Sequence, residues 1–162
     1  MLARALPLWP RPLYPIPPVQ LTVELEGLPP PAPLPGDGAA LVAFMSFAVV
    51  RGFGAQHPFI ALADRLHERH KVRLGPLTTF YEARIDDAED ASRLEMTWQP
   101  AAELAASLDA VTAALATDDD QLRALLTRAG AAEDFGLQLA AVRAAIQPAV
   151  EAGTRVRLSY TL

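Results

Sequence analysis

The stretch of this chain that most resembles a binding site runs from Arg51 to His57, with the sequence RGFGAQH. Gly52 and Gly54 would let the backbone approach an anion closely, and a helix starting just after His57 would offer free N–H groups at its N-terminus. Arg51 would add a bidentate contact to a phosphate or carboxylate. These four residues predict a site for a small anionic ligand.

The same stretch also fits a structural role, in which its two glycines simply make a tight turn. His57 stands where a dinucleotide fingerprint needs its third glycine, and no Gly-Lys-Ser/Thr follows, so neither nucleotide-binding motif is complete. No cofactor is predicted from this or any other part of the sequence. Both interpretations of the Arg51–His57 stretch stay open at this point.

Asp64, His67 and His70 are each three residues apart on an expected helix. Neighbouring members of this set could share a metal ion, but all three span too wide an arc to converge, and His57 is the only other histidine. The chain has no cysteine, which excludes thiolate ligands. No metal site is predicted, and we expect this helix face to be solvated.

Arg65, Arg69, Lys71 and Arg73 form the basic cluster of the sequence. Such a cluster could contact an acidic protein or a phosphate backbone, or it could be the solvated end of a helix. The whole chain has a formal net charge of −5, whereas general nucleic-acid binders usually carry excess positive charge. The sequence therefore disfavours nucleic acid as the partner.

No motif for catalysis stands out. None of the four serines lies in a Gly-x-Ser-x-Gly turn. An acidic run lacks the glycine and the spacing of a calcium loop, and it comprises Asp86, Asp87, Glu89 and Asp90. Paired carboxylates for acid–base chemistry would meet only in the fold, so the sequence leans toward a non-catalytic protein but leaves an enzyme open.

The first 18 residues combine many prolines with large apolar side chains. Eleven of the 15 prolines fall within the first 35 residues, which predicts an extended arm at residues 1–18 and a long surface loop at residues 27–38. Trp9, Leu13 and Tyr14 make this arm too apolar to remain uncovered in water. We expect these residues to contact the chain's own domain, a partner protein or a second copy of the chain.

Hydrophobic spacing predicts three elements in the next part of the chain. Residues 19–26 alternate between apolar and polar, which is typical of a half-buried strand. Residues 39–50 are nearly all apolar and predict a central strand, with a buried helix as the alternative. Residues 58–70 carry apolar side chains at helical spacing behind Pro58 and predict a helix.

Residues 77–85 and 94–98 alternate as two further strands and predict a β-hairpin whose acidic loop covers residues 87–92. Charge and aromatic pairing select one register for this hairpin. It pairs Arg84 with Glu95, Asp86 with Arg93 and Tyr81 with Trp98.

Three helices and a strand complete the expected order. The first helix starts at Pro100, the second has Thr117 as its N-cap, and the third starts near Phe135. The third helix is expected to kink at Pro148 and to end at Gly153. Residues 155–162 alternate as a strand. Because strands and helices are segregated along the chain, we predict one α+β domain over residues 19–162, with an antiparallel or mixed sheet of about five strands and about four helices packed on one face.

Composition sets the class of protein. Hydrophobic residues make up 51% of the chain and charged residues 20%, which is typical of a globular domain. No apolar stretch reaches the roughly 18 residues of a membrane span, and the early prolines interrupt any signal-peptide core. The absence of cysteine fits a reducing, cytoplasmic compartment.

We expect a non-catalytic interaction or accessory protein acting through a protein–protein surface. The alternative is a small-ligand or phosphate-binding domain, or an enzyme, that uses the Arg51–His57 stretch.

Overall fold

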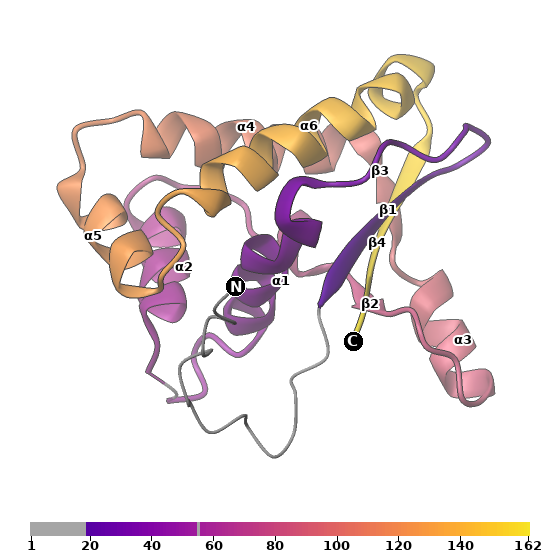
Figure 1. The fold of residues 1–162 in the computed structure, drawn as a ribbon, viewed down its shortest axis with the longest axis horizontal. Helices are drawn as coiled ribbons and strands as arrows, with labels where there is room; N and C mark the ends of the chain where they lie inside the picture. Colours follow the sequence, from indigo (N-terminus) through magenta and orange to yellow (C-terminus); the bar gives the residue numbers. More distant parts are fainter. Residues whose placement is uncertain (1–18, 55) are drawn as a thin grey trace, which may run out of the picture.

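The computed structural model describes residues 19–54 and 56–162, and within them the chain forms an α+β fold with six α-helices and a four-stranded mixed sheet (Figure 1). In chain order the elements are β1 (Gln20–Leu25), η1 (Pro35–Gly38), α1 (Ala39–Val49), α2 (Pro58–Glu68), η2 (Pro76–Thr78), β2 (Tyr81–Glu82), α3 (Ala88–Glu95), β3 (Trp98–Pro100), α4 (Ala101–Leu115), α5 (Asp120–Arg128), α6 (Asp134–Ala152) and β4 (Arg155–Thr161). The elements η1 and η2 are short 3₁₀ turns.

Strand β4, the last element of the chain, is the centre of the sheet. β1 pairs with it antiparallel, with Val23 opposite Leu158. The other edge of β4 is shared, because β2 pairs with it in parallel and β3 pairs antiparallel further along. The predictions of strands at 19–26 and 155–162, and of an α+β fold with a mixed sheet, are therefore confirmed, whereas the sheet has four strands instead of about five.

The prediction of a central strand at residues 39–50 is wrong, because Ala39–Val49 form helix α1. The helix is buried around much of its circumference, so its sequence lacks the polar face by which an amphipathic helix is recognised. Within α1, Phe44 lies edge-on to Phe135 of α6 and Phe59 of α2, at ring-centroid distances of 5.1 and 5.9 Å. The alternative of a buried helix is the correct one.

The predicted hairpin is also wrong. β2 is only two residues long and pairs with β4, not with β3. Most of the predicted loop and the first two residues of the predicted return strand form helix α3. Its N-cap Asp87 accepts a hydrogen bond from the Asp90 backbone N–H at 2.8 Å. The acidic run is therefore a helix start, where carboxylates oppose the helix dipole. None of the three predicted cross-strand pairs forms, and Trp98 lies opposite Arg157 instead.

The remaining helix predictions are confirmed with small corrections. α2, α4, α5 and α6 lie where hydrophobic spacing places them, and α6 continues through Pro148 to end at Gly153, whose φ is 66°. The N-cap of α5 is Asp119 and not Thr117. Within the described residues the number of helices exceeds the prediction by two, since α1 was expected as a strand and α3 as the loop and the start of the return strand of a hairpin.

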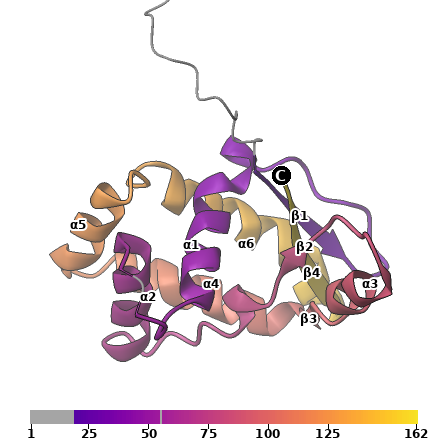
Figure 2. The same ribbon diagram turned by 90° about the horizontal axis from the view of Figure 1, so that it is seen from below.

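The helices are distributed unevenly around the sheet. α1 and α6 pack directly on β1, while α2 packs against α5 at the end of the helical layer remote from the sheet. Figure 2 shows α3 beside β2, apart from the other five helices. None of the helices in the described ranges is long and apolar enough to cross a membrane.

Candidate functional site

The basic residues that follow α2 are turned outward by the way this helix ends. Lys71 adopts a left-handed backbone conformation with φ 56°. The Val72 N–H donates to the Leu66 carbonyl, six residues earlier, at 3.0 Å and so closes the end of the helix. Side chains then alternate, so that Val72 and Leu74 are buried while Lys71 and Arg73 are exposed.

Two hydrogen bonds fix this segment in place. Lys71 Nζ donates to the Glu68 carbonyl at 2.7 Å, at the C-terminal end of α2 where a positive charge is favourable. The buried Ser107 hydroxyl of α4 donates to the Arg73 carbonyl at 2.6 Å. The backbone of Arg73 is therefore tied to α4, whereas its guanidinium group stays exposed.

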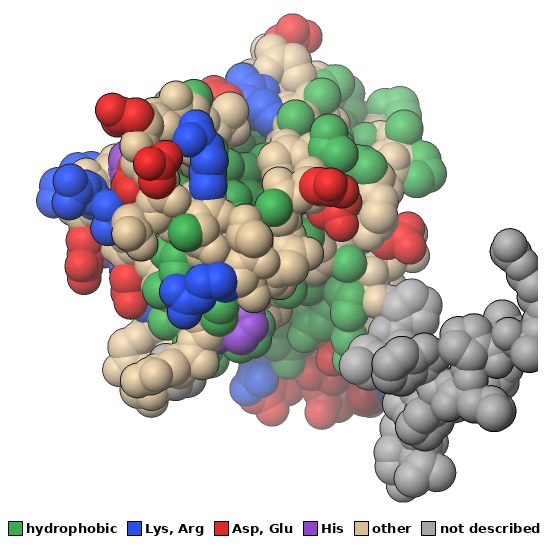
Figure 3. Space-filling view, turned by 60° about the vertical axis from the view of Figure 1, so that its left-hand side comes forward, with side chains coloured by type: hydrophobic (Ala, Val, Ile, Leu, Met, Phe, Trp, Pro, Cys, Tyr) green, Lys and Arg blue, Asp and Glu red, His purple; other side chains and the backbone are tan. Residues whose placement is uncertain are grey.

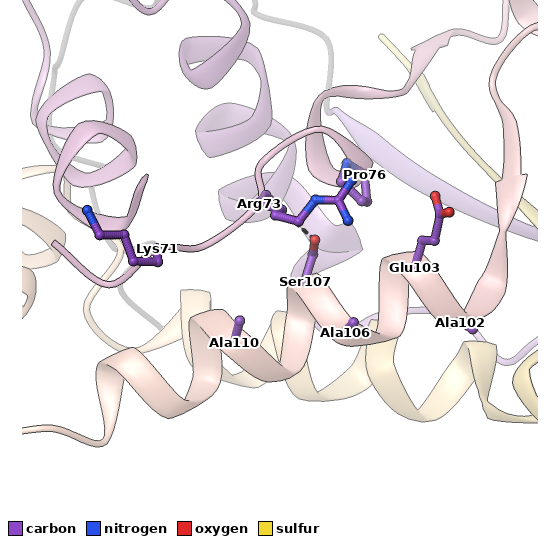
Figure 4. Close-up of a pocket in the computed structure, with 8 residues that line it drawn as sticks. All are labelled: Lys71, Arg73, Pro76, Ala102, Glu103, Ala106, Ser107 and Ala110. Carbon is purple, nitrogen blue, oxygen red and sulfur yellow. Dashed lines mark hydrogen bonds between the residues drawn. The ribbon is translucent and has the colours of Figure 1, made fainter. Parts of the chain in front are cut away.

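A groove of about 360 Å³ runs between this segment and the N-terminal half of α4. Figure 4 shows Arg73 extending over α4 between Pro76 and Ser107, with Ala106 and Ala110 on the side of α4 that faces the segment. We call this hollow the α4 groove. Its lining consists of Lys71, Arg73, Pro76, Ala102, Glu103, Ala106, Ser107 and Ala110.

Two further hollows adjoin the α4 groove, and Arg73 lines all three. One, of about 560 Å³, lies between the end of α1 and the chain after α2, and it includes Arg51 and His67. The other, of about 330 Å³, includes His67 and Lys71. We call the basic residues that line these three hollows the basic strip: Arg51, His67, Lys71 and Arg73.

The basic strip keeps much of its charge available. Arg51 lies 3.6 Å from a carboxylate oxygen of Asp64 and is partly neutralised. Within residues 19–54 and 56–162, no carboxylate forms an ion pair with Lys71 or Arg73. Large apolar side chains are exposed at the neighbouring end of α1, including Val49 and, beyond it, Phe53, which is 83% exposed.

The other members of the predicted basic cluster are used differently. Arg65 donates to both carboxylate oxygens of Asp119, at 2.8 and 3.0 Å, and His70 Nε2 lies 2.7 Å from the same carboxylate. The Asp119 side chain is only 9% exposed. Hydrogen bonds from Arg65 first and from His70 second hold the pKa of Asp119 well below its usual value. Arg65 is therefore a structural residue of this ion cluster.

Residues 51–54 form a turn after α1, in which Gly52, Phe53 and Gly54 are exposed. Gly52 and Gly54 have φ values of 89° and 79°, as the predicted tight turn requires. His57 is the N-cap of α2, where its Nδ1 accepts the Phe59 N–H at 3.0 Å. Its ring also stacks on Phe47 with a centroid distance of 3.8 Å. These contacts give His57 a structural role.

The N–H groups at the start of α2 are already bonded. Pro58 has none, the Phe59 N–H bonds to the His57 ring, and the next two bond to the His57 carbonyl. A cleft of about 480 Å³ nevertheless lies beside His57, between α2 and α5, and Asp64 and Arg128 are among the residues that line it. Any anion held here would therefore contact side chains and not the helix N-terminus.

The three residues considered for a metal ion point to different partners. Asp64 lies near Arg51, His70 bonds to Asp119, and His67 Nδ1 is 3.4 Å from the Val72 carbonyl. Among the residues that the structure describes, no group of three His, Asp or Glu side chains is placed to share a metal. The predicted interaction residues Trp9, Leu13 and Tyr14 lie outside the described residues.

Sequence reasoning missed the α4 groove. Ala102, Ala106 and Ala110 are spaced by four, so they share one helix face, and that signal was present in the sequence. The groove itself depends on where the segment after α2 lies, which spacing within α4 could not reveal. The role of Asp119 was likewise not predicted, because its partners Arg65 and His70 lie about 50 residues earlier in the chain.

Comparisons with family models, with curated proteins and with solved structures gave no match for this chain.

Proposed function

We propose that this protein is a non-catalytic interaction or accessory protein that binds an acidic partner protein through the basic strip and the α4 groove. The observation that carries the proposal is the convergence of three hollows on Arg73, in a chain whose formal net charge is −5. A local positive surface on an acidic molecule directs association toward negatively charged partners.

Apolar surface beside the basic strip favours a protein as the partner. Val49 and Phe53 are large, exposed and close in sequence to Arg51, and the α4 groove has an alanine floor. Protein interfaces typically combine an apolar or aromatic anchor with arginine, whereas phosphate contacts need mainly positive charge.

The hydrogen bonding of the described hydroxyl groups supports a non-catalytic role. The His70–Asp119 pair resembles the base and orienting residue of a nucleophile system, but His70 bonds only to Asp119 in the described part of the chain. Nearby hydroxyls are used elsewhere, since Ser107 and Thr117 donate to the carbonyls of Arg73 and Ala114. The absence of cysteine fits a cytoplasmic setting for such a protein.

Site-specific photo-cross-linking in cells of the source organism tests this proposal. A benzophenone side chain at Gly75, which is exposed and has open space around its Cα, should give one dominant protein adduct. The same probe at Ala144, exposed on α6, is the matched control and should not give that adduct. Reversing the charge of both Lys71 and Arg73 to Glu should abolish the adduct, and the cross-linked partner segment should be rich in Asp and Glu.

Equal adducts at both positions, or adducts that survive the charge reversal, would contradict the proposal. Lys71→Glu also removes the hydrogen bond from Lys71 Nζ to the Glu68 carbonyl, so Arg73→Glu alone is the second variant and should also weaken the adduct. Circular dichroism should show the wild-type fold for Arg73→Glu, because Arg73 is exposed and forms no ion pair with a described carboxylate. A loss of adduct with an unchanged fold therefore reports on the surface itself.

The N-terminal arm would be a second contact region under this proposal. Its apolar residues Trp9, Leu13 and Tyr14 would pack on a partner protein or on a second copy of the chain. Native mass spectrometry of the full chain beside a version that lacks residues 1–18 tests this. If removal of the arm changes neither oligomeric state nor stability nor the cross-linked adduct, the arm takes no part.

A second candidate function is the binding of a small anion in the cleft between α2 and α5. The cleft of about 480 Å³ has a volume suited to a small ligand, and His57 and Arg128 are among its lining residues. Figure 3 brings this side of the molecule forward and shows cationic and anionic side chains interspersed over it. This mixture of charges favours an anion less than the basic strip does.

Thermal unfolding in the presence of inorganic phosphate, nucleoside monophosphates and small carboxylic acids tests the second candidate. A bound anion should raise the melting temperature in a concentration-dependent way. Arg128→Ala should remove the shift, because Arg128 lines the cleft, whereas Arg123→Ala on the exposed side of α5 should keep it. No shift with any of these compounds would argue against an anion site.

A further inference from the structure

The α4 groove has a defined shape. Its floor is formed by Ala102, Ala106 and Ala110, which lie one helical turn apart on the same side of α4. Eight residues of α-helix rise about 12 Å, so the floor is about two turns long and follows the helix axis. Methyl side chains along this length would let another backbone approach α4 closely.

The wall of the groove is positively charged. Lys71 and Arg73 stand on the side opposite α4, and Glu103 is the only carboxylate in the lining. In Figure 4 the Arg73 guanidinium lies beside Pro76, above Ser107 of α4. An occupant that fits both parts must therefore present apolar side chains to the floor and carboxylates to the wall.

We infer that the α4 groove binds an acidic amphipathic helix of a partner protein. This inference rests on the proposed function and specifies the partner. A helix laid along α4 places its i, i+4 and i+7 side chains on the alanines for two turns, which is the helix-in-groove mode of recognition. Its acidic side faces Lys71 and Arg73, and a basic residue near its end can face Glu103.

Other occupants fit less well. Nucleic acid would place phosphates near Glu103 and would leave the alanine floor unused. Residues 1–18 of the chain contain Arg4 and Arg11 and no carboxylate side chain, so their charge does not complement the wall. The exposed acidic start of α3 in a second copy has the right charge, and it becomes one outcome of the test.

Fluorescence anisotropy with a defined peptide tests the inference. The probe is a fluorescein-labelled 18-residue peptide, on the order of five helical turns, with leucine and alanine on one face and glutamate on the other. Its control has every glutamate replaced by lysine. The acidic peptide should bind with saturation and weaken as salt is raised, because part of the attraction is between exposed charges.

Four variants locate the binding. Ala106→Trp fills the groove, and Arg73→Glu replaces a positive charge on its wall with a negative one. Each variant should weaken binding of the acidic peptide by about tenfold or more. Ala113→Trp, at another exposed position of α4, and Arg123→Glu, at an exposed position of α5, should leave affinity within about twofold. Amide chemical shifts of the wild-type protein should move at Lys71, Arg73, Ala106 and Ala110 when the acidic peptide is added.

Several results would overturn the inference. These are equal binding of the lysine peptide, tighter binding of a duplex oligonucleotide, no binding of any probe, or binding that Ala106→Trp leaves intact. Concentration-dependent self-association that Ala106→Trp abolishes would assign the groove to a second copy. If cross-links at Gly75 still identify an acidic partner while the peptide fails to bind, the proposed function stands and the helical occupant is wrong.

Discussion

His70 Nε2 lies 2.7 Å from the carboxylate of Asp119, and this contact joins the end of α2 to the start of α5. Arg65 completes the cluster by donating to both oxygens of the same carboxylate. Because His70 immediately precedes Lys71, the cluster helps to hold the backbone of Lys71 and the segment after it in place. Asp119 also caps α5, since its Oδ1 accepts the Gln121 N–H at 3.3 Å. One carboxylate thus links three structural features.

Replacing Asp119 with asparagine should lower the melting temperature at neutral pH, because Arg65 and His70 lose their charged partner in a mostly buried setting. Thermal unfolding followed by circular dichroism measures the effect. Asp118→Asn is the matched control, since Asp118 is exposed and adjacent. Equal melting temperatures of the two variants would show that the cluster contributes nothing to stability.

The pH dependence of the Asp119 contribution has a definite sign. Hydrogen bonds from Arg65 and His70 lower the pKa of Asp119 in the folded protein, below the ordinary value of 3.8 that applies to the unfolded chain. The folded state therefore gains stability that is fully present above pH 3.8 and is lost as pH falls through the folded pKa. The difference in melting temperature between the wild type and Asp119→Asn should narrow progressively below that pH. A difference that stays constant into strong acid would contradict the assignment.

Gln138 is a buried polar residue of α6 whose side-chain oxygen accepts the Leu41 N–H at 2.9 Å, in the first turn of α1. Gln138→Ala leaves this N–H without its partner and should reduce the free energy of unfolding by about 1–3 kcal/mol. Urea denaturation measures this change. Gln121→Ala, at an exposed position of α5, should stay within about 0.5 kcal/mol of the wild type. Equal stability of the two variants would remove Gln138 as the cap of α1.

Local patterns predicted the elements that have one buried and one solvated face. β1 and β4 alternate, and α2 and α5 have clear apolar stripes, so spacing alone was enough. The prediction for residues 39–50 was wrong because α1 is surrounded by α2, α6 and β1. Burial on several sides removes the hydrophobic periodicity that distinguishes a helix from a buried strand. The prediction of a hairpin in place of α3 was wrong because alternating residues on either side of it suggested two paired strands. Asp87 and the carboxylates after it instead stabilise the start of a helix.

The candidate site shows the same limit at longer range. The sequence revealed the charges of Lys71 and Arg73 and the glycines of the turn at 52–54, because these are properties of single residues. It could not reveal that Arg65 bonds to Asp119, which is 54 residues away, or that Arg73 lies over α4. His57 was read as a possible ligand-binding residue, and only its distances to Phe59 and Phe47 reveal the cap and the stacking contact.

Truncation to alanine should lower stability strongly at Phe44 and hardly at Phe53, although both residues lie in or just after the segment predicted as a strand. Phe44 is fully buried between α2 and α6, so Phe44→Ala should cost about 3–5 kcal/mol of unfolding free energy. Phe53 is 83% exposed, so Phe53→Ala should change stability by no more than about 0.5 kcal/mol. Denaturant titration of both variants measures these values, and a large loss with Phe53→Ala would mean that the turn is packed and not exposed.

His57 offers a direct choice between a structural and a ligand-binding role. If its Nδ1 serves mainly to cap α2, His57→Ala should reduce the unfolding free energy by about 1 kcal/mol, whether or not phosphate is present. His57→Asn should recover part of that loss, because asparagine is also a good N-cap, although the stacking on Phe47 is still missing. His67→Ala, at an exposed position of the same helix, is the control and should change stability by no more than about 0.5 kcal/mol. Urea denaturation with and without phosphate measures all three variants. If His57→Ala left stability unchanged but removed a phosphate-dependent stabilisation of the wild type, His57 would belong to an anion site and the capping role would be wrong.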